Sequence, residues 1–147
     1  MKRKIFIVLI FILSFVTSFS LEEYQKIILK EVNIERIKNN LNPLEINNHL
    51  NKIAVVKAKD MAKEKKMSHI SKKFGATFSL IKKDKIPYTK AAENIASGHK
   101  TPEFVIERWL KSKGHRKNIL EKEYRFIGIG KAIDSDGKTY WVQLFIN

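Results

Sequence analysis

The sequence predicts an α/β fold in which helices cover both faces of a central sheet. The first half of the chain carries apolar residues at helical spacing, and the last part is an almost continuous apolar strand from Tyr140 to Ile146. A strand that is apolar on both sides requires a covering layer on each face. With 147 residues, 44% of them hydrophobic, the chain is long enough for one domain with its own core. We therefore expect a three-layer α-β-α sandwich.

The N-terminus has the pattern of a secretory signal peptide. Three basic residues at positions 2–4 precede an apolar run from Ile5 to Val16, and small residues follow. An uncleaved membrane anchor fits less well, because a spanning helix needs about 20 apolar residues. We expect residues 1–20 to be removed and residues 21–147 to form the mature domain. The protein is then exported to a periplasmic, cell-surface or extracellular location, with no transmembrane span after processing.

Composition excludes several kinds of site. The chain has no cysteine, so it has no disulfide, no thiol catalysis, no thiolate metal site and no cysteine for lipid attachment. Its formal net charge is +14, or +11 without the three basic residues of the signal peptide. The excess comes from 24 lysines, spread along the chain, against 5 arginines. Nucleic-acid readers concentrate arginine on one element, so we expect no nucleic-acid partner. Weak attraction to anionic lipid or polysaccharide is compatible with this charge.

The N-terminal half predicts two long helices. The first covers 22–39, with Asn33 and Arg36 among its apolar positions, which predicts buried, hydrogen-bonded polar groups there. The second begins at Asn47 or Asn48 and runs to about Lys66, with an apolar stripe on one face and lysines on the other. A short third helix is expected over 74–81 and a loop over 82–87, whereas 88–95 is ambiguous and can be extended.

Residues 92–120 concentrate the local signals of the chain. Thr101, Pro102 and Glu103 are the N-cap, first-turn proline and first-turn acid of a helix that buries Trp109 and that we expect to end at Gly114. His115 would follow that end directly. Beyond it, apolar residues at 127, 129 and 133 alternate with others, and a turn at 134–137 leads to the last strand, which predicts a hairpin.

No compact catalytic motif is present: the chain lacks GxGxxG, a phosphate loop, HExxH and GxSxG. Of the four histidines, His49 and His99 have polar neighbours and are expected at the surface. His69 and His115 both follow predicted helices, and Glu93 lies between them, 24 and 22 residues away. Such long separations do not identify a site. Two imidazoles, a carboxylate and a water can hold a divalent ion such as zinc.

Several motifs together resemble one family. They are ENIAxG from position 93, SxGHRxNIL from position 112, Asn33-x-x-Arg36, Ser68-His69, Ile127-Gly128-Ile129-Gly130 and Trp141-Val142-Gln143-Leu144-Phe145. In this order they resemble the bacterial branch of the CAP superfamily, which comprises cysteine-rich secretory proteins, antigen 5 and pathogenesis-related 1 proteins. The resemblance covers nearly all of the mature chain. It implies an α-β-α sandwich with a central, largely antiparallel sheet.

The resemblance also implies a cleft lined by two histidines and two acids. The first histidine falls on His69, the first acid on Glu93 and the second histidine on His115. The second acid falls on Ser112, whose neutral hydroxyl weakens any metal site formed by His69 and His115. Asn94 and Trp109 are the expected supporting residues. No cofactor is required, and a weakly bound divalent metal such as zinc is the one ion that the residues suggest.

Alternative roles for these residues stay open. Ser112 could act as a nucleophile with His115 as its base, but the sequence shows neither an orienting acid nor an oxyanion hole. We therefore prefer a capping or supporting role for Ser112. His69, Glu93 and His115 can also hydrogen-bond one another simply to lock the helical layers onto the sheet.

For function, we expect an exported, non-enzymatic protein that binds a lipid, a metal or a host or surface molecule in the cleft or an adjoining groove. A metal-dependent hydrolase and an adhesin that acts through the lysine-rich exterior are the alternatives.

Overall fold

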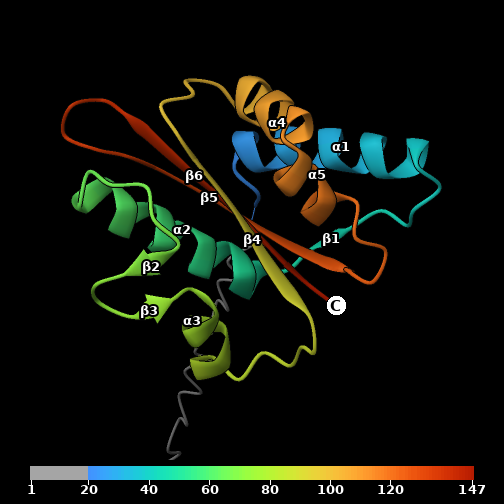
Figure 1. Cartoon of the computed structure of the whole chain (residues 1–147), viewed down its shortest axis with the longest axis horizontal. Coiled ribbons are helices and arrows are strands. Elements are labelled where there is room, and N and C mark those ends of the chain that lie inside the picture. Colours follow the sequence, from blue (N-terminus) through green and yellow to red (C-terminus); the bar gives the residue numbers. More distant parts are fainter. Residues whose placement is uncertain (1–19) are drawn as a thin grey trace, which may run out of the picture.

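The computed structural model describes residues 20–147 (Figure 1). The expected signal peptide lies outside the described residues except for Ser20. The elements follow one another as α1 (Glu23–Lys38), β1 (Glu45–Ile46), α2 (Asn48–Lys63), β2 (Ile70–Ser71), β3 (Gly75–Ala76), α3 (Phe78–Lys83), β4 (Ala91–Ser97), α4 (Pro102–Lys111), α5 (Lys113–Ile119), β5 (Phe126–Ile133) and β6 (Thr139–Ile146).

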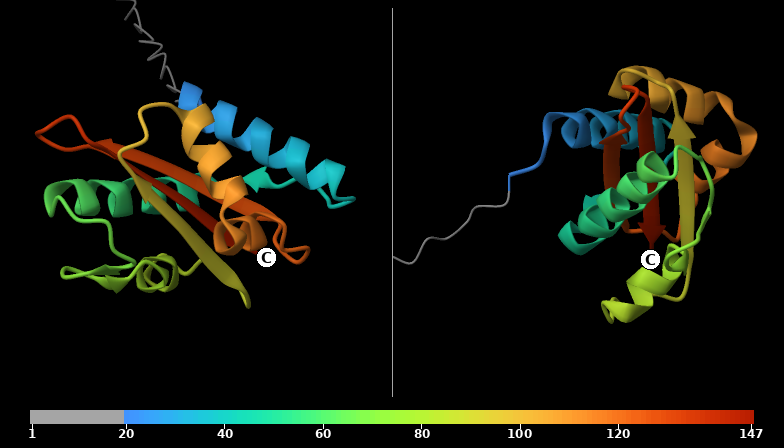
Figure 2. Two further views of the ribbon diagram at one scale, coloured as in Figure 1. Left: turned by 45° about the horizontal axis from the view of Figure 1, so that its top comes forward. Right: turned by 90° about the vertical axis from the view of Figure 1, so that its left-hand side faces the viewer.

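The elements form the three layers expected from the sequence. The main sheet has the strand order β1-β5-β6-β4, and it is antiparallel except where the two-residue β1 pairs with β5. Helices α2 and α3 lie on one face, and α1, α4 and α5 lie on the other (Figure 2). The β2–β3 hairpin forms a separate small sheet beside α2. The α-β-α sandwich with a largely antiparallel sheet is therefore confirmed.

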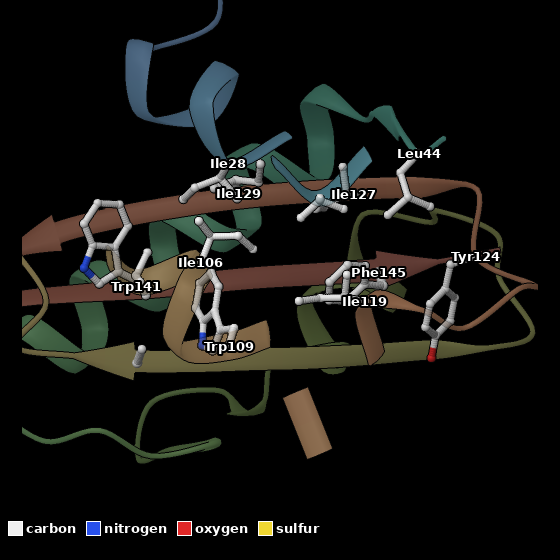
Figure 3. Packing of buried hydrophobic residues seen from close by; sticks show 13 residues of the cluster. Ile28, Leu44, Ile106, Trp109, Ile119, Tyr124, Ile127, Ile129, Trp141 and Phe145 are labelled. Carbon is white, nitrogen blue, oxygen red and sulfur yellow. The ribbon is translucent and has the colours of Figure 1, made fainter. Parts of the chain in front are cut away.

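Strand β6 separates two hydrophobic clusters, and all eight of its residues are buried. Because successive side chains of a strand point to opposite faces, Trp141 and Phe145 join the cluster under α1, α4 and α5, whereas Val142 and Leu144 join the cluster under α2. Figure 3 shows the first of these clusters, with Trp109 of α4 lying over the strands. The prediction that the last strand is covered on both faces is confirmed.

Helix α2 lies directly against β5 because two glycines leave room for it. A Cβ atom added at Gly128 would come within 2.4 Å of the Leu50 backbone carbonyl carbon. One added at Gly130 would come within 2.2 Å of the Ala54 carbonyl carbon. Both distances are far below any van der Waals contact, so only glycine is compatible with this helix position.

Arg36 ties the end of α1 to two distant loops. Its side chain is fully buried and donates to four backbone carbonyl oxygens, at 2.8–3.3 Å. The acceptors belong to Asn42, Ile119, Glu121 and Tyr124. Asn33 exchanges two hydrogen bonds with the backbone of Leu44. The expected buried polar groups of the first helix are thus present, and they position the segments that follow α1 and α5.

Most predicted helix starts are correct. The Asn47 side chain accepts from the backbone N–H groups of His49 and Leu50, and Thr101 accepts from Phe104 N–H at 3.2 Å. The third helix begins four residues later than expected, because β3 occupies its first positions. Of the ambiguous segment 88–95, the part from Ala91 onward is extended and belongs to β4, which continues to Ser97. No helix within residues 20–147 has the length and apolar character needed to cross a bilayer.

One helix end was predicted wrongly. Helix α4 ends at Lys111, Ser112 turns the chain in an extended conformation, and Gly114 lies inside the next helix, α5. Glycine is tolerated there because it lies in the first turn of a short helix. His115 is therefore a helical residue and does not follow a helix end.

Replacing Gly130 with alanine tests the close contact between α2 and β5. The added methyl group overlaps the Ala54 backbone, so we expect the free energy of unfolding to fall by about 1 to 3 kcal/mol. Gly114→Ala is the matched control. No atom lies within 4 Å of the added Cβ, and alanine favours a helix, so stability should rise by about 0.5 kcal/mol. Urea denaturation of both variants measures the difference, and equal effects would contradict the contact.

Candidate functional site

Strand β4 distributes two adjacent side chains to opposite faces of the sheet. Glu93 pairs with Leu144 and therefore points toward α2, whereas Asn94 pairs with Gln143 and points toward α4 and α5. The order β1-β5-β6-β4 makes β4 an edge strand, so groups from both helical layers can meet around it. The Glu-Asn pair thus connects one histidine on each side of the sheet.

On the α2 side, Glu93 binds His69. The loop after α2 brings His69 Nδ1 to 2.7 Å from Glu93 Oε1. The Glu93 side chain is only 5% exposed, whereas that of His69 is 59% exposed. The pair is therefore a largely buried carboxylate that holds a solvent-accessible imidazole. This contact brings together two of the three residues that the resemblance implies.

Lys57 of α2, on which the charge of Glu93 acts, contradicts one expectation. Lysines were expected on the exposed face of α2, but Lys57 is completely buried. Its Nζ is 5.7 Å from the centre of the Phe74 ring, and neither this Nζ nor Glu93 Oε2 has a hydrogen-bond partner within residues 20–147. Burial lowers the pKa of Lys57, and the nearby charges of Glu93 and then Asp60 oppose this shift. A helical stripe that includes small alanines leaves room for a long side chain to turn inward.

On the other side, Asn94 fixes the position of His115. Asn94 Nδ2 donates to the backbone oxygen of His115 and to Gln143 Oε1, both at 3.1 Å, and its Oδ1 accepts from Asn118 Nδ2 at 2.8 Å. Asn94 is completely buried. Asn94 therefore fastens α5 to β4.

A cavity of about 220 Å³ opens beside the end of β4. We call it the β4 cavity. It is lined by Met67, Ile95, Ala96, Ser97, His99, Arg108, Trp109, Ser112 and His115. Trp109 is 1% exposed, and its Nε1 donates to the outward-facing carbonyl oxygen of Ile95 at 3.3 Å. Ser112 lines the cavity at the α4–α5 junction, where its side chain makes no capping hydrogen bond.

His99 lies in this cavity, although the sequence suggested only a surface position. Gly98 has a φ of +83°, which turns the chain after β4. The His99 carbonyl oxygen then accepts from Trp141 Nε1 at 2.8 Å and from the Thr139 hydroxyl. His49, by contrast, is exposed as expected. Two histidines, His99 and His115, thus line the β4 cavity. The glycine of the ENIAxG motif, which turns the chain just before His99, is the sequence signal that could have predicted the position of His99.

The surroundings of both histidines in the cavity favour the neutral imidazole over the charged form. Burial lowers the pKa of His99, and the positive charge of Arg108 lowers it further. Burial also lowers the pKa of His115, with a smaller effect from the charge of His69. His69 is therefore close enough to His115 for their charges to interact. The structure brings His69, Glu93 and His115 into one region, and it adds Lys57, His99 and Arg108, which the sequence did not single out.

The residues present do not fit a tight metal site. Within residues 20–147, no three His, Cys, Asp or Glu side chains are placed to hold a metal ion together. His69 Nδ1 is already bonded to Glu93, and Ser112 stands where the resemblance implies a second acid. Structural and catalytic zinc sites normally use at least three protein ligands.

The interaction between Lys57 and Glu93 can be measured by a double-mutant cycle. Both groups are buried, so Glu93→Gln leaves the Lys57 ammonium without its main countercharge, and Lys57→Met leaves the carboxylate without its cation. We expect the double variant to be less destabilised than the sum of the single variants by about 1 to 3 kcal/mol. Urea denaturation gives the three free energies of unfolding.

Lys59 is the matched control for this cycle. It lies two residues further along α2 and is exposed. Lys59→Met combined with Glu93→Gln should be additive within about 0.5 kcal/mol. If the effects of Lys57→Met and Glu93→Gln on the free energy of unfolding are also additive, the charges of Lys57 and Glu93 do not interact.

Comparison with known proteins identifies the family. The profile of the Cysteine-rich secretory protein family, CAP, matches residues 29–145. The chain is 40% identical over 127 residues to the Bacillus subtilis protein YkwD, covering 86% of this chain and 48% of YkwD. An extracellular protein of Bacillus anthracis that contains an SCP domain has a solved structure with a TM-score of 0.75 and 30% identity, covering 83% of this chain and 39% of that one.

A further solved structure is similar over nearly its whole length. An outer surface protein of Borrelia burgdorferi has a TM-score of 0.78 and 28% identity, covering 87% of this chain and 95% of that chain. The present chain, by contrast, spans less than half of YkwD. The matched residues include the whole of the β4 cavity and the His69–Glu93 pair, and the chain therefore belongs to the CAP family of cysteine-rich secretory proteins.

Proposed function

We propose that this CAP-domain protein is exported and binds a small organic ligand in the β4 cavity, without catalysing a reaction. The observation that carries the proposal is a cavity of about 220 Å³ at the edge strand, which His99, Arg108 and His115 line, while the bonded His69–Glu93 pair occupies the other face of the same strand. Apolar residues such as Met67 and Trp109 line this cavity together with a few polar side chains, which is the usual composition of a small-molecule site.

Export is supported by the N-terminal pattern and by the similar proteins. The related domain of Bacillus anthracis belongs to an extracellular protein, and the Borrelia relative is an outer surface protein. The expected signal peptide at positions 1–20 is consistent with such a location. The proposed location is therefore the periplasm, the cell surface or the medium.

The arrangement favours binding over hydrolysis. A serine nucleophile needs a base within hydrogen-bond reach, and within residues 20–147 the Ser112 hydroxyl makes no hydrogen bond to His115. Glu93 is on the other face of β4 and is occupied by His69. The same contacts fasten loop, strand and helix together, so a structural role of the three residues accompanies ligand binding.

A fragment screen by nuclear magnetic resonance tests this function. We expect neutral and charged fragments to shift the amide resonances of Ser97, His99 and Ser112 more than those of other regions. A second cavity of about 490 Å³, lined by residues such as Tyr24, Gln25 and Val55, serves as the internal comparison. Hits that gather only at this second cavity, or no hits at all, would refute the proposal.

Zinc should bind at most weakly, because within residues 20–147 no three candidate ligands are placed around one point and the Glu93 carboxylate is already bonded to His69. With the zinc concentration below its dissociation constant, stabilisation stays under about 0.4 kcal/mol, and the melting temperature rises by less than about 2 °C. Thermal unfolding with micromolar zinc checks this. A larger rise that disappears in His69→Ala and in His115→Ala would establish a true metal site.

A further inference from the structure

The ionisable side chains that line the β4 cavity are all basic. Arg108, His99 and His115 line it, and no aspartate or glutamate within residues 20–147 does. The nearest acid along β4, Glu93, points to the opposite face, where it binds His69. A ligand in the cavity therefore meets nitrogen donors without a competing carboxylate.

Arg108 supplies a permanent positive charge to this cavity. It makes no salt bridge within the part of the chain that the structure describes. Its neighbour Glu107 is bonded to Lys111 instead. Arg108 is also close enough to His99 for its charge to act on that imidazole. An exposed guanidinium that lines a cavity and forms no salt bridge within residues 20–147 is suited to an anionic group, and its planar fork matches a carboxylate.

His99 is held in place before any ligand arrives. Its carbonyl oxygen accepts two hydrogen bonds, from Trp141 and Thr139. Its ring packs edge-on against Phe104, with 5.1 Å between ring centres and an interplanar angle of 83°. Because this imidazole is already ordered, its use as a donor costs little additional entropy.

We propose that the β4 cavity binds the carboxylate of a small, partly apolar molecule, with Arg108 as its main anion-binding residue and His99 as a second donor. The hydroxyl of Ser112 is a further donor, and Met67 and Trp109 contribute apolar surface. Arg108 is the permanent cation among the lining residues, so it neutralises a singly charged carboxylate but leaves a doubly charged phosphate with uncompensated negative charge. The inference rests on the proposed function and names its ligand class.

The second cavity does not share this character. Lys52 and Lys131 line it, but so does the carboxylate of Glu22. In addition, the Lys131 ammonium lies over the rings of Tyr24 and Trp141, at 5.9 and 5.0 Å from their centres. An anion there meets a competing acid and a cation that is already engaged. We therefore place the carboxylate site beside β4.

Titration of the purified protein with butyrate and with its neutral analogue butyramide, followed by amide chemical shifts, tests the inference. Butyrate should bind at least about tenfold more tightly than butyramide and should shift Ser97, His99 and Ser112. Arg108→Gln should weaken butyrate binding at least about tenfold. Lys113→Gln removes an exposed charge from the same corner without touching the cavity, so binding should change less than about twofold.

Two further ligands identify the source of the carboxylate. A tripeptide with a free C-terminus that binds more tightly than butyrate, and loses binding when amidated, would indicate the end of a peptide; otherwise a free acid is the ligand. Inorganic phosphate that binds more tightly than butyrate would overturn the assignment of a carboxylate.

Other outcomes separate this inference from the proposed function. If neutral fragments bind in the β4 cavity but butyrate has no advantage over butyramide, the carboxylate assignment is wrong and the ligand-binding function stands. If Arg108→Gln and Lys113→Gln weaken butyrate binding equally, the binding reflects the overall positive charge of the surface, and the assignment to Arg108 is wrong. If no fragment of any charge binds beside β4, the proposed function itself fails. Arg108 is exposed, so its variant should keep the melting temperature of the parent, which confirms folding.

Discussion

The contact between α2 and the two glycines of β5 determines the geometry on which the site depends. With hydrogen atoms at Gly128 and Gly130, the helix backbone rests on the strand backbone, closer than any side chain would permit. This distance sets how deep the next turns of α2 lie. Lys57 is consequently buried near the Phe74 ring, where the charge of Glu93 acts on it, and the loop after α2 is short enough to deliver His69 to the same carboxylate. The glycines thus act on the site without touching it.

The free edges of the sheet explain why the cavity lies where it does. Beyond the short β1, the outer edge of β5 is protected by side chains: Gln25 donates to the Ile129 carbonyl oxygen, and Asn51 accepts from the Ile129 N–H. At the opposite edge, the Trp109 indole binds the carbonyl oxygen of Ile95. Unpaired strand edges invite association with other chains, and such side-chain caps prevent it. At β4 the cap also forms a wall of the cavity, so protection of the edge and formation of the site share one residue.

Local signals in the sequence predicted much of the fold but little of the site's composition. Helix starts at Asn47 and Thr101 depend on residues within one turn, so they can be read directly, and the family motifs located His69, Glu93 and His115. The end of α4 was misplaced because Gly114 is a helix-ending residue only where the backbone turns left-handed, which depends on tertiary packing. Lys57 and His99 were missed because their burial depends on contacts with distant segments. A two-residue strand such as β1 likewise has no periodicity of its own.

Five buried side-chain atoms within residues 20–147 have no hydrogen-bond partner, and two of them belong to Lys57 and Glu93. Lys57 Nζ, Glu93 Oε2 and Gln143 Nε2 are buried without hydrogen-bond partners within residues 20–147, and Gln143 also accepts a hydrogen bond from Asn94. Each such group opposes folding by about 1 to 3 kcal/mol, and apolar residues of similar size would remove this cost. The rest of the core around β6 is hydrophobic, so packing alone does not require them. The charges of Lys57 and Glu93 act on each other, so a role in holding the carboxylate that binds His69 accounts for keeping both.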